Sequence, residues 1–180
     1  MRSNNIVIII YNYQIYIECN NDIDVINIDK NIIKEGRINN IKEFINCLKQ
    51  SKIIKTSSFK LVDDNILMLY FGNYNDMELN NILNGFKDKG YEKVKLKHIS
   101  KVLDSSYSYL FHSNGYYYLF DIDNYVLYSK FLNSSLLDLN KNYIMDYNSY
   151  QKLSLFDSKN IYYISNVYQY IKSCLIKRNK

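Results

Sequence analysis

Apolar residues in the first 30 positions recur with the spacing of β-strands. Residues 5–11 form a mostly apolar run of the length of a buried strand, and residues 14–19 alternate, with Ile15 and Ile17 on one face. Residues 22–28 alternate again after a short polar break. These three segments predict an antiparallel meander near the start of the chain.

Three later segments change to a spacing of three or four residues, which is typical of amphipathic helices. The predicted helices cover about 39–50, 79–86 and 167–175. Asn75 or Asp76 can cap the start of the second helix, and Gly90 can end it in the left-handed conformation. We expect the core to include apolar side chains from all three helices: Ile41, Ile45, Leu79, Ile82, Phe86, Ile171 and Cys174.

Further short segments have the composition of strands. They are 59–62, 66–71, 92–97, 107–111, 116–122, 125–131 and 161–164. Asp63-Asp64-Asn65 is predicted to be a turn, and Asn114-Gly115 is the strongest hairpin signal in the chain. Residues 133–159 are mixed and show no clear register.

Strands and helices that interleave with several hairpins predict an α/β or α+β fold, with a mixed sheet and three amphipathic helices. The length of 180 residues suits a single domain over 1–180, and two tight subdomains, 1–104 and 105–180, are the alternative. No convincing sequence repeat is present.

The composition is skewed, with 25 Ile, 25 Asn and 20 Tyr but no Ala, Pro or Trp. A genome poor in G and C would produce this skew without selection on the protein, so the Tyr and Asn excess does not by itself indicate a binding surface. The 47% of hydrophobic residues argues against disorder. Collagen-like, Pro/Gly-rich and disulfide-framework classes are excluded.

Charge and cysteine content point to a cytoplasmic protein without a membrane span. The three cysteines are an odd number and form no CxxC pair, and Cys47 and Cys174 lie on apolar helix stripes, which favours reduced and buried thiols. The apolar run near the start is shorter than the region of about 7–15 residues in a signal peptide. The net charge is +5, and the 23 basic residues are 20 Lys and only 3 Arg, which does not favour base readout.

Candidate metal ligands are few. His98 and His112 have no Cys or His at metal-ligand spacing. Two Asp-Ile-Asp triplets, at 22–24 and 121–123, could hold Mg²⁺ if both carboxylates share a strand face, although Asp at strand ends more commonly forms turns. We therefore expect no metal, no cofactor and no catalytic residue, and Asp121 with Asp123 remains the alternative for a small metal enzyme.

Lys93, Lys95 and Lys97 alternate with apolar residues, so a strand would place all three on one side. With His98 they form a candidate interaction face, although a solvated or aggregation-blocking edge is the favoured interpretation. The Tyr116–Tyr118 triplet could stack on bases, but a strand would split it between two faces. No P-loop, GxGxxG, GxSxG or HExxH motif is present.

The order of elements resembles the actin-like (ribonuclease H-like) family of pilus assembly and cell division, the PilM and FtsA type. The resemblance covers about residues 5–131. It rests on a glycine stretch before the first helix, a helix–glycine–strand unit and a strand that ends in Asp: 34–40, 90–103 and 117–122. It implies two Asp-x-Gly phosphate turns, but here Tyr11-Asn12-Tyr13-Gln14 stands at the first, and Asp121-Ile122 is followed by Asp123 instead of Gly at the second.

The resemblance therefore implies a shortened, degenerate member that has lost nucleotide binding. We expect a non-catalytic cytoplasmic module that binds another protein, as an assembly or scaffold component. The alternative is a nucleic-acid-binding protein or a phage-encoded inhibitor of a host defence, with nucleic acid as the less favoured partner.

Overall fold

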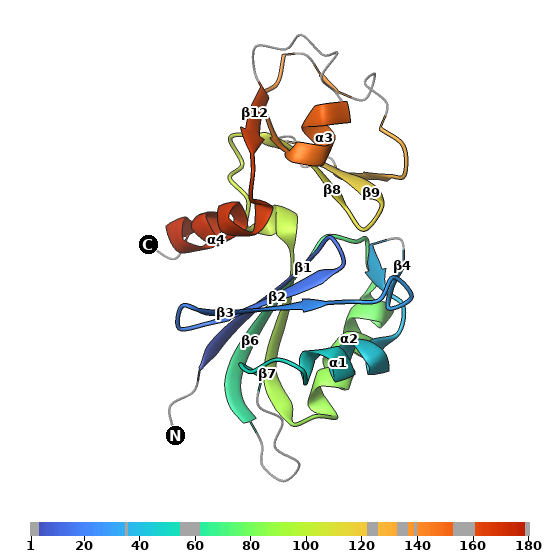
Figure 1. The fold of residues 1–180 in the computed structure, drawn as a ribbon, viewed down its shortest axis with the longest axis vertical. Helices are drawn as coiled ribbons and strands as arrows, with labels where there is room; N and C mark the ends of the chain where they lie inside the picture. Colours follow the sequence, from blue (N-terminus) through green and yellow to red (C-terminus); the bar gives the residue numbers. More distant parts are fainter. Residues whose placement is uncertain are drawn as a thin grey trace. The chain divides into compact units, whose positions relative to one another are not determined.

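The computed structural model describes residues 4–34, 36–54, 62–121, 126–132, 137–138, 140–152 and 161–178. The chain divides into two units, Met1–Ile99 and Ser100–Lys180, each with its own sheet (Figure 1).

The sheet of the first unit has five strands in the order β3-β2-β1-β6-β7. The meander of β1 (Asn5–Tyr11), β2 (Gln14–Cys19) and β3 (Asp22–Asn27) is antiparallel, as the alternation predicts. β6 (Val62–Tyr70) pairs parallel to β1, and β7 (Tyr91–His98) pairs parallel to β6. The sheet is therefore mixed, and β3 and β7 are its edge strands.

Two helices cover one face of this sheet (Figure 1). α1 (Ile41–Leu48) and α2 (Asp76–Lys87) contact each other, and their apolar stripes join the strand side chains in one core. Ile45, Ile82 and Phe86 are buried there as predicted, whereas Ile41 and Leu79 are only half-buried. A short antiparallel ribbon, β4 (Ile33–Lys34) with β5 (Arg37–Ile38), precedes α1.

The ends of α2 follow the sequence signals. The Asn75 side chain accepts a hydrogen bond from the Glu78 amide at 2.9 Å, and the Glu78 side chain accepts one from the Asn75 amide at 2.8 Å, which forms a capping box. Gly90, just beyond the helix, has a φ of 86°, the left-handed region that glycine adopts without strain.

The predicted turn at Asp63-Asp64-Asn65 is wrong. These residues lie within β6, where the register against β7 shifts between Val62 and Asn65. A bulge absorbs polar residues in a strand without reversing the chain, so a turn-like composition is no proof of a turn. The segment 59–61, predicted as the preceding strand, lies outside the described residues.

The sheet of the second unit also has five strands, in the order β10-β9-β8-β11-β12. β8 (Ser108–Ser113), β9 (Tyr116–Phe120) and β10 (Val126–Ser129) form the second predicted meander. β11 (Tyr143–Asp146) and β12 (Ile161–Ile164) extend the sheet in parallel. β11 falls within the stretch whose register the sequence left unclear.

Three helical segments accompany this second sheet: η1 (Ile99–Lys101), which starts at the boundary between the units, α3 (Tyr147–Lys152) and α4 (Val167–Arg178). The six-residue α3 was not predicted, so the described chain has four α-helices where the periodicity predicted three. Ile171 and Cys174 of α4 are buried as expected. The mixed α/β class predicted from the sequence is confirmed.

The two sheets share one topology. Each consists of a three-stranded antiparallel meander whose first strand also pairs in parallel with a fourth strand, which pairs in parallel with a fifth. β1, β2, β3, β6 and β7 thus correspond to β8, β9, β10, β11 and β12. The sequence shows no matching repeat, because many apolar sequences satisfy one topology.

Candidate functional site

Ligands of open α/β sheets bind beyond the carboxyl ends of the strands, where the strand order reverses. In the first unit this place is the end of β1 and β6, and aromatic rings occupy it. The Tyr11 and Phe71 ring centroids are 5.6 Å apart, and Tyr70 contacts Tyr74 at 5.1 Å and His98 at 5.3 Å. The sheet end therefore presents packed rings instead of a phosphate-binding turn.

The β4–β5 ribbon packs against the same end of the sheet. The Ile38 amide donates a hydrogen bond to the Tyr74 hydroxyl at 2.7 Å, and burial raises the pKa of that hydroxyl. A Cβ added at Gly72 would lie 2.3 Å from the Gly36 carbonyl oxygen. Gly72 is thus required for the β4–β5 ribbon to approach the end of β6.

Polar side chains occupy the corresponding end of the second sheet. Ser113, Asn114, Asp146 and Ser149 are all buried. The Asp146 carboxylate accepts hydrogen bonds from the Ser149 amide at 3.0 Å and from the His112 amide at 3.2 Å. The Ser149 hydroxyl has no hydrogen-bond partner among the described residues. These contacts hold the start of α3 against β8.

The shared topology also relates the tight turns of the two sheets to each other. The first expected turn, Tyr11–Gln14, joins β1 to β2, so its counterpart is the β8–β9 turn at Asn114-Gly115, and not Asp121 at the end of β9. Both turns are tight two-residue hairpins with positive φ: 50° and 56° at Asn12 and Tyr13, and 54° and 80° at Asn114 and Gly115. Neither turn contains an aspartate.

The Asp121 carboxylate has partners within the second unit. Its carboxylate accepts hydrogen bonds from Lys141 Nζ at 2.8 and 2.9 Å and from the Ser108 hydroxyl at 2.9 Å, so it ties β8 to the chain before β11. Asp123, its proposed co-ligand, lies outside the described residues. Across the part of the chain that is described, no group of three or more His, Cys, Asp or Glu could hold a metal ion.

The other aspartate triplet also has a structural role. The Ser51 hydroxyl and the Lys52 amide donate hydrogen bonds to the Asp24 carboxylate and lower its pKa, the amide at 2.8 Å. Asp24 thereby fixes the segment after α1 to the edge strand β3. Asp22 is exposed at the start of that strand.

The structure separates the predicted lysine face from His98. Lys93, Lys95 and Lys97 are exposed on one side of the edge strand β7, while Val94 and Leu96 pack on the core beneath the helices. His98 follows the alternation of Val94 and Leu96, and its Nε2 lies 3.2 Å from the Phe71 carbonyl oxygen. The candidate face therefore consists of the three lysines alone, which we call the lysine edge.

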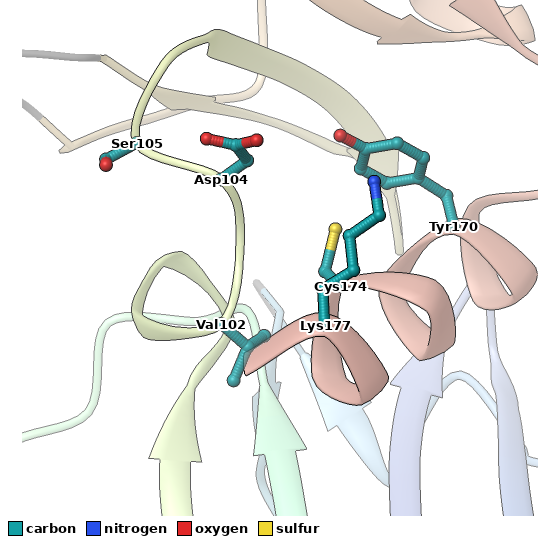
Figure 2. Close-up of a pocket in the computed structure, with 6 residues that line it drawn as sticks. All are labelled: Val102, Asp104, Ser105, Tyr170, Cys174 and Lys177. Carbon is teal, nitrogen blue, oxygen red and sulfur yellow. The ribbon is translucent and has the colours of Figure 1, made fainter. Parts of the chain in front are cut away.

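A half-open pocket of about 260 Å³ lies within the second unit, between α4 and the chain that follows η1 (Figure 2). Tyr170, Cys174 and Lys177 line it from α4, and Val102, Asp104 and Ser105 line it from the loop. The Tyr170 hydroxyl lies 3.1 Å from the Tyr109 hydroxyl, which donates to the Asp104 carbonyl oxygen at 2.9 Å. The hydroxyls thus join the helix to the loop.

Five tyrosines, four of them exposed, lie around β12, the edge strand of the second sheet. Tyr147 and Tyr150 from α3 contact the Tyr163 ring of β12, with centroid distances of 5.8 and 5.7 Å. On the other face of β12, Tyr162 contacts Tyr107 at 5.8 Å. We call these side chains the tyrosine edge: Tyr107, Tyr147, Tyr150, Tyr162 and Tyr163.

Sequence reasoning did not find the tyrosine edge. The signal was present, because Tyr147 and Tyr150 are spaced three residues apart, as on one helix face, and Tyr162-Tyr163 stands in a predicted strand. The general excess of tyrosine hid it, since nothing in a composition tells exposed rings from buried ones. Tyr109, Tyr117, Tyr118 and Tyr143 are in fact buried.

Two further findings bear on the expectations above. Cys19, Cys47 and Cys174 are free thiols, with Cys174 buried and the other two half-buried. Among the described residues, no helix has the length and apolar character needed to cross a membrane.

Comparison with known proteins gives a distant likeness only. No protein-family model matches the sequence, and no curated protein matches it. The chain is similar to two crystal structures of MreB5 of Spiroplasma citri. The one bound to AMPPNP is 11% identical with a TM-score of 0.49 and covers 66% of this chain, and the one bound to ADP is 10% identical with a TM-score of 0.48 and covers 71%.

The chain spans about half the length of these structures, 48% and 49%. Neither of these two structures is of the PilM or FtsA type. Because both TM-scores are below 0.5, we base the fold class on the strand order of the two sheets.

Proposed function

We propose that the chain is a non-catalytic module that binds another protein. The observation that carries this proposal is the tyrosine edge, where four exposed rings lie on the edge strand β12 and on the adjacent α3. Tyrosine is enriched at protein–protein interfaces because its ring supplies a large contact area with little conformational entropy to lose. Aromatic rings this exposed have no evident role in the core of the unit that carries them.

The ends of the two sheets support a module without nucleotide binding. In the first sheet, rings fill the place where a ligand would enter. The β1–β2 hairpin lacks both the aspartate and the glycine that the family resemblance implies, and the β8–β9 hairpin lacks the aspartate. On the sequence resemblance, we further propose a degenerate relative of the PilM and FtsA type that acts as an assembly or scaffold component.

The first test measures nucleotide binding by isothermal titration of the full chain with Mg-ATP and with Mg-GTP. We expect no measurable heat of binding for either nucleotide, because a nucleotide would have to displace the packed rings at Tyr11 and Phe71. Micromolar affinity for either nucleotide would contradict the loss of nucleotide binding.

The second test looks for the partner. A photo-cross-linking amino acid replaces Tyr150 on the tyrosine edge, and the matched control replaces Met77, which is 70% exposed on α2. We expect one discrete cross-linked protein at Tyr150 in the source cell and none in common with Met77. Identical patterns at the two positions would argue against a partner at this edge.

The lysine edge favours a second candidate, a nucleic-acid-binding protein. Three exposed ammonium groups on one strand face could meet phosphates. This candidate predicts that labelled single-stranded oligonucleotides bind to the protein. The logarithm of the binding constant should then fall linearly with the logarithm of the salt concentration. If no oligonucleotide binds in low salt, the nucleic-acid-binding candidate is wrong and the protein-binding proposal remains.

A further inference from the structure

The corresponding edge strands of the two sheets differ in how their open side is protected. An exposed edge strand offers unpaired backbone groups to other chains, and charged side chains, lysine above all, discourage such pairing. β7 carries Lys93, Lys95 and Lys97. Its counterpart β12, which has the sequence Ile-Tyr-Tyr-Ile, carries no charged residue.

The open side of β12 lies within the tyrosine edge. Among the described strands, β12 pairs with β11 only, so the backbone groups that point away from β11 have no strand partner there. Tyr163 lies on the α3 face of the strand and Tyr162 on the opposite face, and each ring is held by other rings. Aromatic side chains therefore lie on both faces of a strand edge that has no partner among the described strands.

The area of this surface indicates what kind of occupant fits it. Tyr147, Tyr150, Tyr162 and Tyr163 are 43–54% exposed. A fully exposed aromatic side chain offers about 200 Å², so the four present about 400 Å². From these rings alone, two copies meeting across a two-fold axis would bury about 800 Å², below the roughly 1,200 Å² of a stable interface. A short segment that gains backbone hydrogen bonds needs less side-chain area.

We propose that β12 accepts an extended, uncharged segment of the partner protein as a sixth strand of the second sheet. This inference rests on the proposed function and adds the mode of binding. Backbone hydrogen bonds to β12 supply affinity, and alternate side chains of the segment contact Tyr163 on one face and Tyr162 on the other. Uncharged side chains, apolar or hydroxyl-bearing, suit both faces, because the tyrosine edge contains no charge to pair with.

The test uses a fluorescein-labelled eight-residue peptide of alternating valine and threonine as the probe. The control peptide has the same ends but two prolines in its centre, which cannot donate backbone hydrogen bonds. We expect saturable fluorescence anisotropy with the alternating peptide and none with the proline peptide. We also expect slower amide hydrogen exchange in Ile161–Ile164 when the alternating peptide is bound.

Two variants locate the binding. Tyr163→Lys places a lysine on the edge strand β12, like those that discourage pairing at β7, and Tyr150→Lys places the same charge on α3. Each should weaken binding of the alternating peptide at least tenfold, whereas Met77→Lys, on α2, should leave it within twofold. Circular dichroism establishes whether each variant is folded. If Tyr163→Lys does not fold, Tyr150→Lys still tests the proposal.

Three outcomes would overturn strand docking: equal binding of the two peptides, no binding of the alternating peptide, or unchanged binding by both folded variants. A wild-type dimer that Tyr163→Lys dissociates would also overturn it, because the occupant would be a second copy. If the peptide fails while the cross-link at Tyr150 persists, the docking mode is wrong and the protein-binding function stands. If the peptide does not bind and no cross-link forms at Tyr150, the protein-binding function is wrong as well.

Discussion

At the scale of single residues, stability depends on a few large side chains that the fold encloses completely. Phe86 is one of these: it lies on the inner face of α2, fully buried, with its ring 6.3 Å from that of Tyr91 on β7. Met77 lies on the same helix but is 70% exposed. The two positions separate the effect of burial from that of helix propensity.

Replacing Phe86 with Ala should lower the free energy of unfolding by about 3–5 kcal/mol, because the change removes apolar contacts and leaves a cavity. Met77→Ala should change it by less than about 0.5 kcal/mol. Urea denaturation followed by circular dichroism measures both. A Phe86→Ala protein as stable as the wild type would show that α2 does not pack as described.

At the scale of elements, a few side chains set where helices begin and what strand edges can meet. Glu78 combines two tasks, since one carboxylate oxygen completes the capping box of α2 and the other accepts from Arg37 Nη1 of β5 at 3.2 Å. The start of the helix is thereby joined to the β4–β5 ribbon. The cap is thus a tertiary contact as well as a local one.

Asn75→Ala should destabilise the protein by about 0.5–2 kcal/mol, because the Glu78 amide loses its acceptor. Asn73, which is exposed just before the cap, supplies the control, and Asn73→Ala should have an effect within about 0.5 kcal/mol. Thermal melts of the two variants compare them. Equal losses at both positions would mean that the cap contributes nothing of its own.

The lysine edge can be tested by charge reversal. Changing Lys93, Lys95 and Lys97 together to Glu should leave the chain folded and the Tyr150 cross-link intact, because solvated side chains on an edge strand contribute little. Circular dichroism and the cross-link are the readouts. A folded triple variant that no longer cross-links to its partner would instead show that the lysine edge binds an acidic protein. Salt should then weaken that complex.

At the scale of the whole molecule, one sheet topology occurs twice with different side chains. The first sheet packs aliphatic side chains beneath two helices, whereas the second places many of its aromatic residues in its interior. Fourteen of the 20 tyrosines lie in residues 100–180. Several of these tyrosines are buried, so burial affects the ionisation of several hydroxyl groups in the second unit.

Burial raises the pKa of both Tyr91 and Tyr109 to about 12, from an ordinary value of 10.0. The unfolded chain loses these protons above pH 10 while the folded chain keeps them. The stability that they contribute is therefore complete below pH 10 and is lost as the pH rises towards 12. Unfolding by urea at a series of pH values should show this decline.

Tyr109→Phe removes one ionisable group and should make the decline between pH 10 and 12 shallower. Tyrosinate absorbance over the same range follows the ionisation directly. A Tyr109→Phe profile that coincides with the wild type would contradict the burial of this hydroxyl.

The sequence by itself determined most of the local structure. The bounds of β1, β2 and β12, the capped start of α2 and the Asn114-Gly115 turn all follow from periodicity and turn chemistry, because these depend on neighbours within a few residues. The mixed α/β class follows in turn from the order of such elements.

Only the tertiary structure decided which positions meet. Alternation separates the two faces of a strand but does not say which face is covered: Ile23 and Val25 are exposed on β3, and Ile26 is buried. The pairing of β1 with β6, and of β8 with β11, joins segments far apart in the chain, so the duplicated topology has no local signal. The tyrosine edge exists because that pairing leaves β12 at the margin beside α3, which no spacing of tyrosines along the sequence could fix.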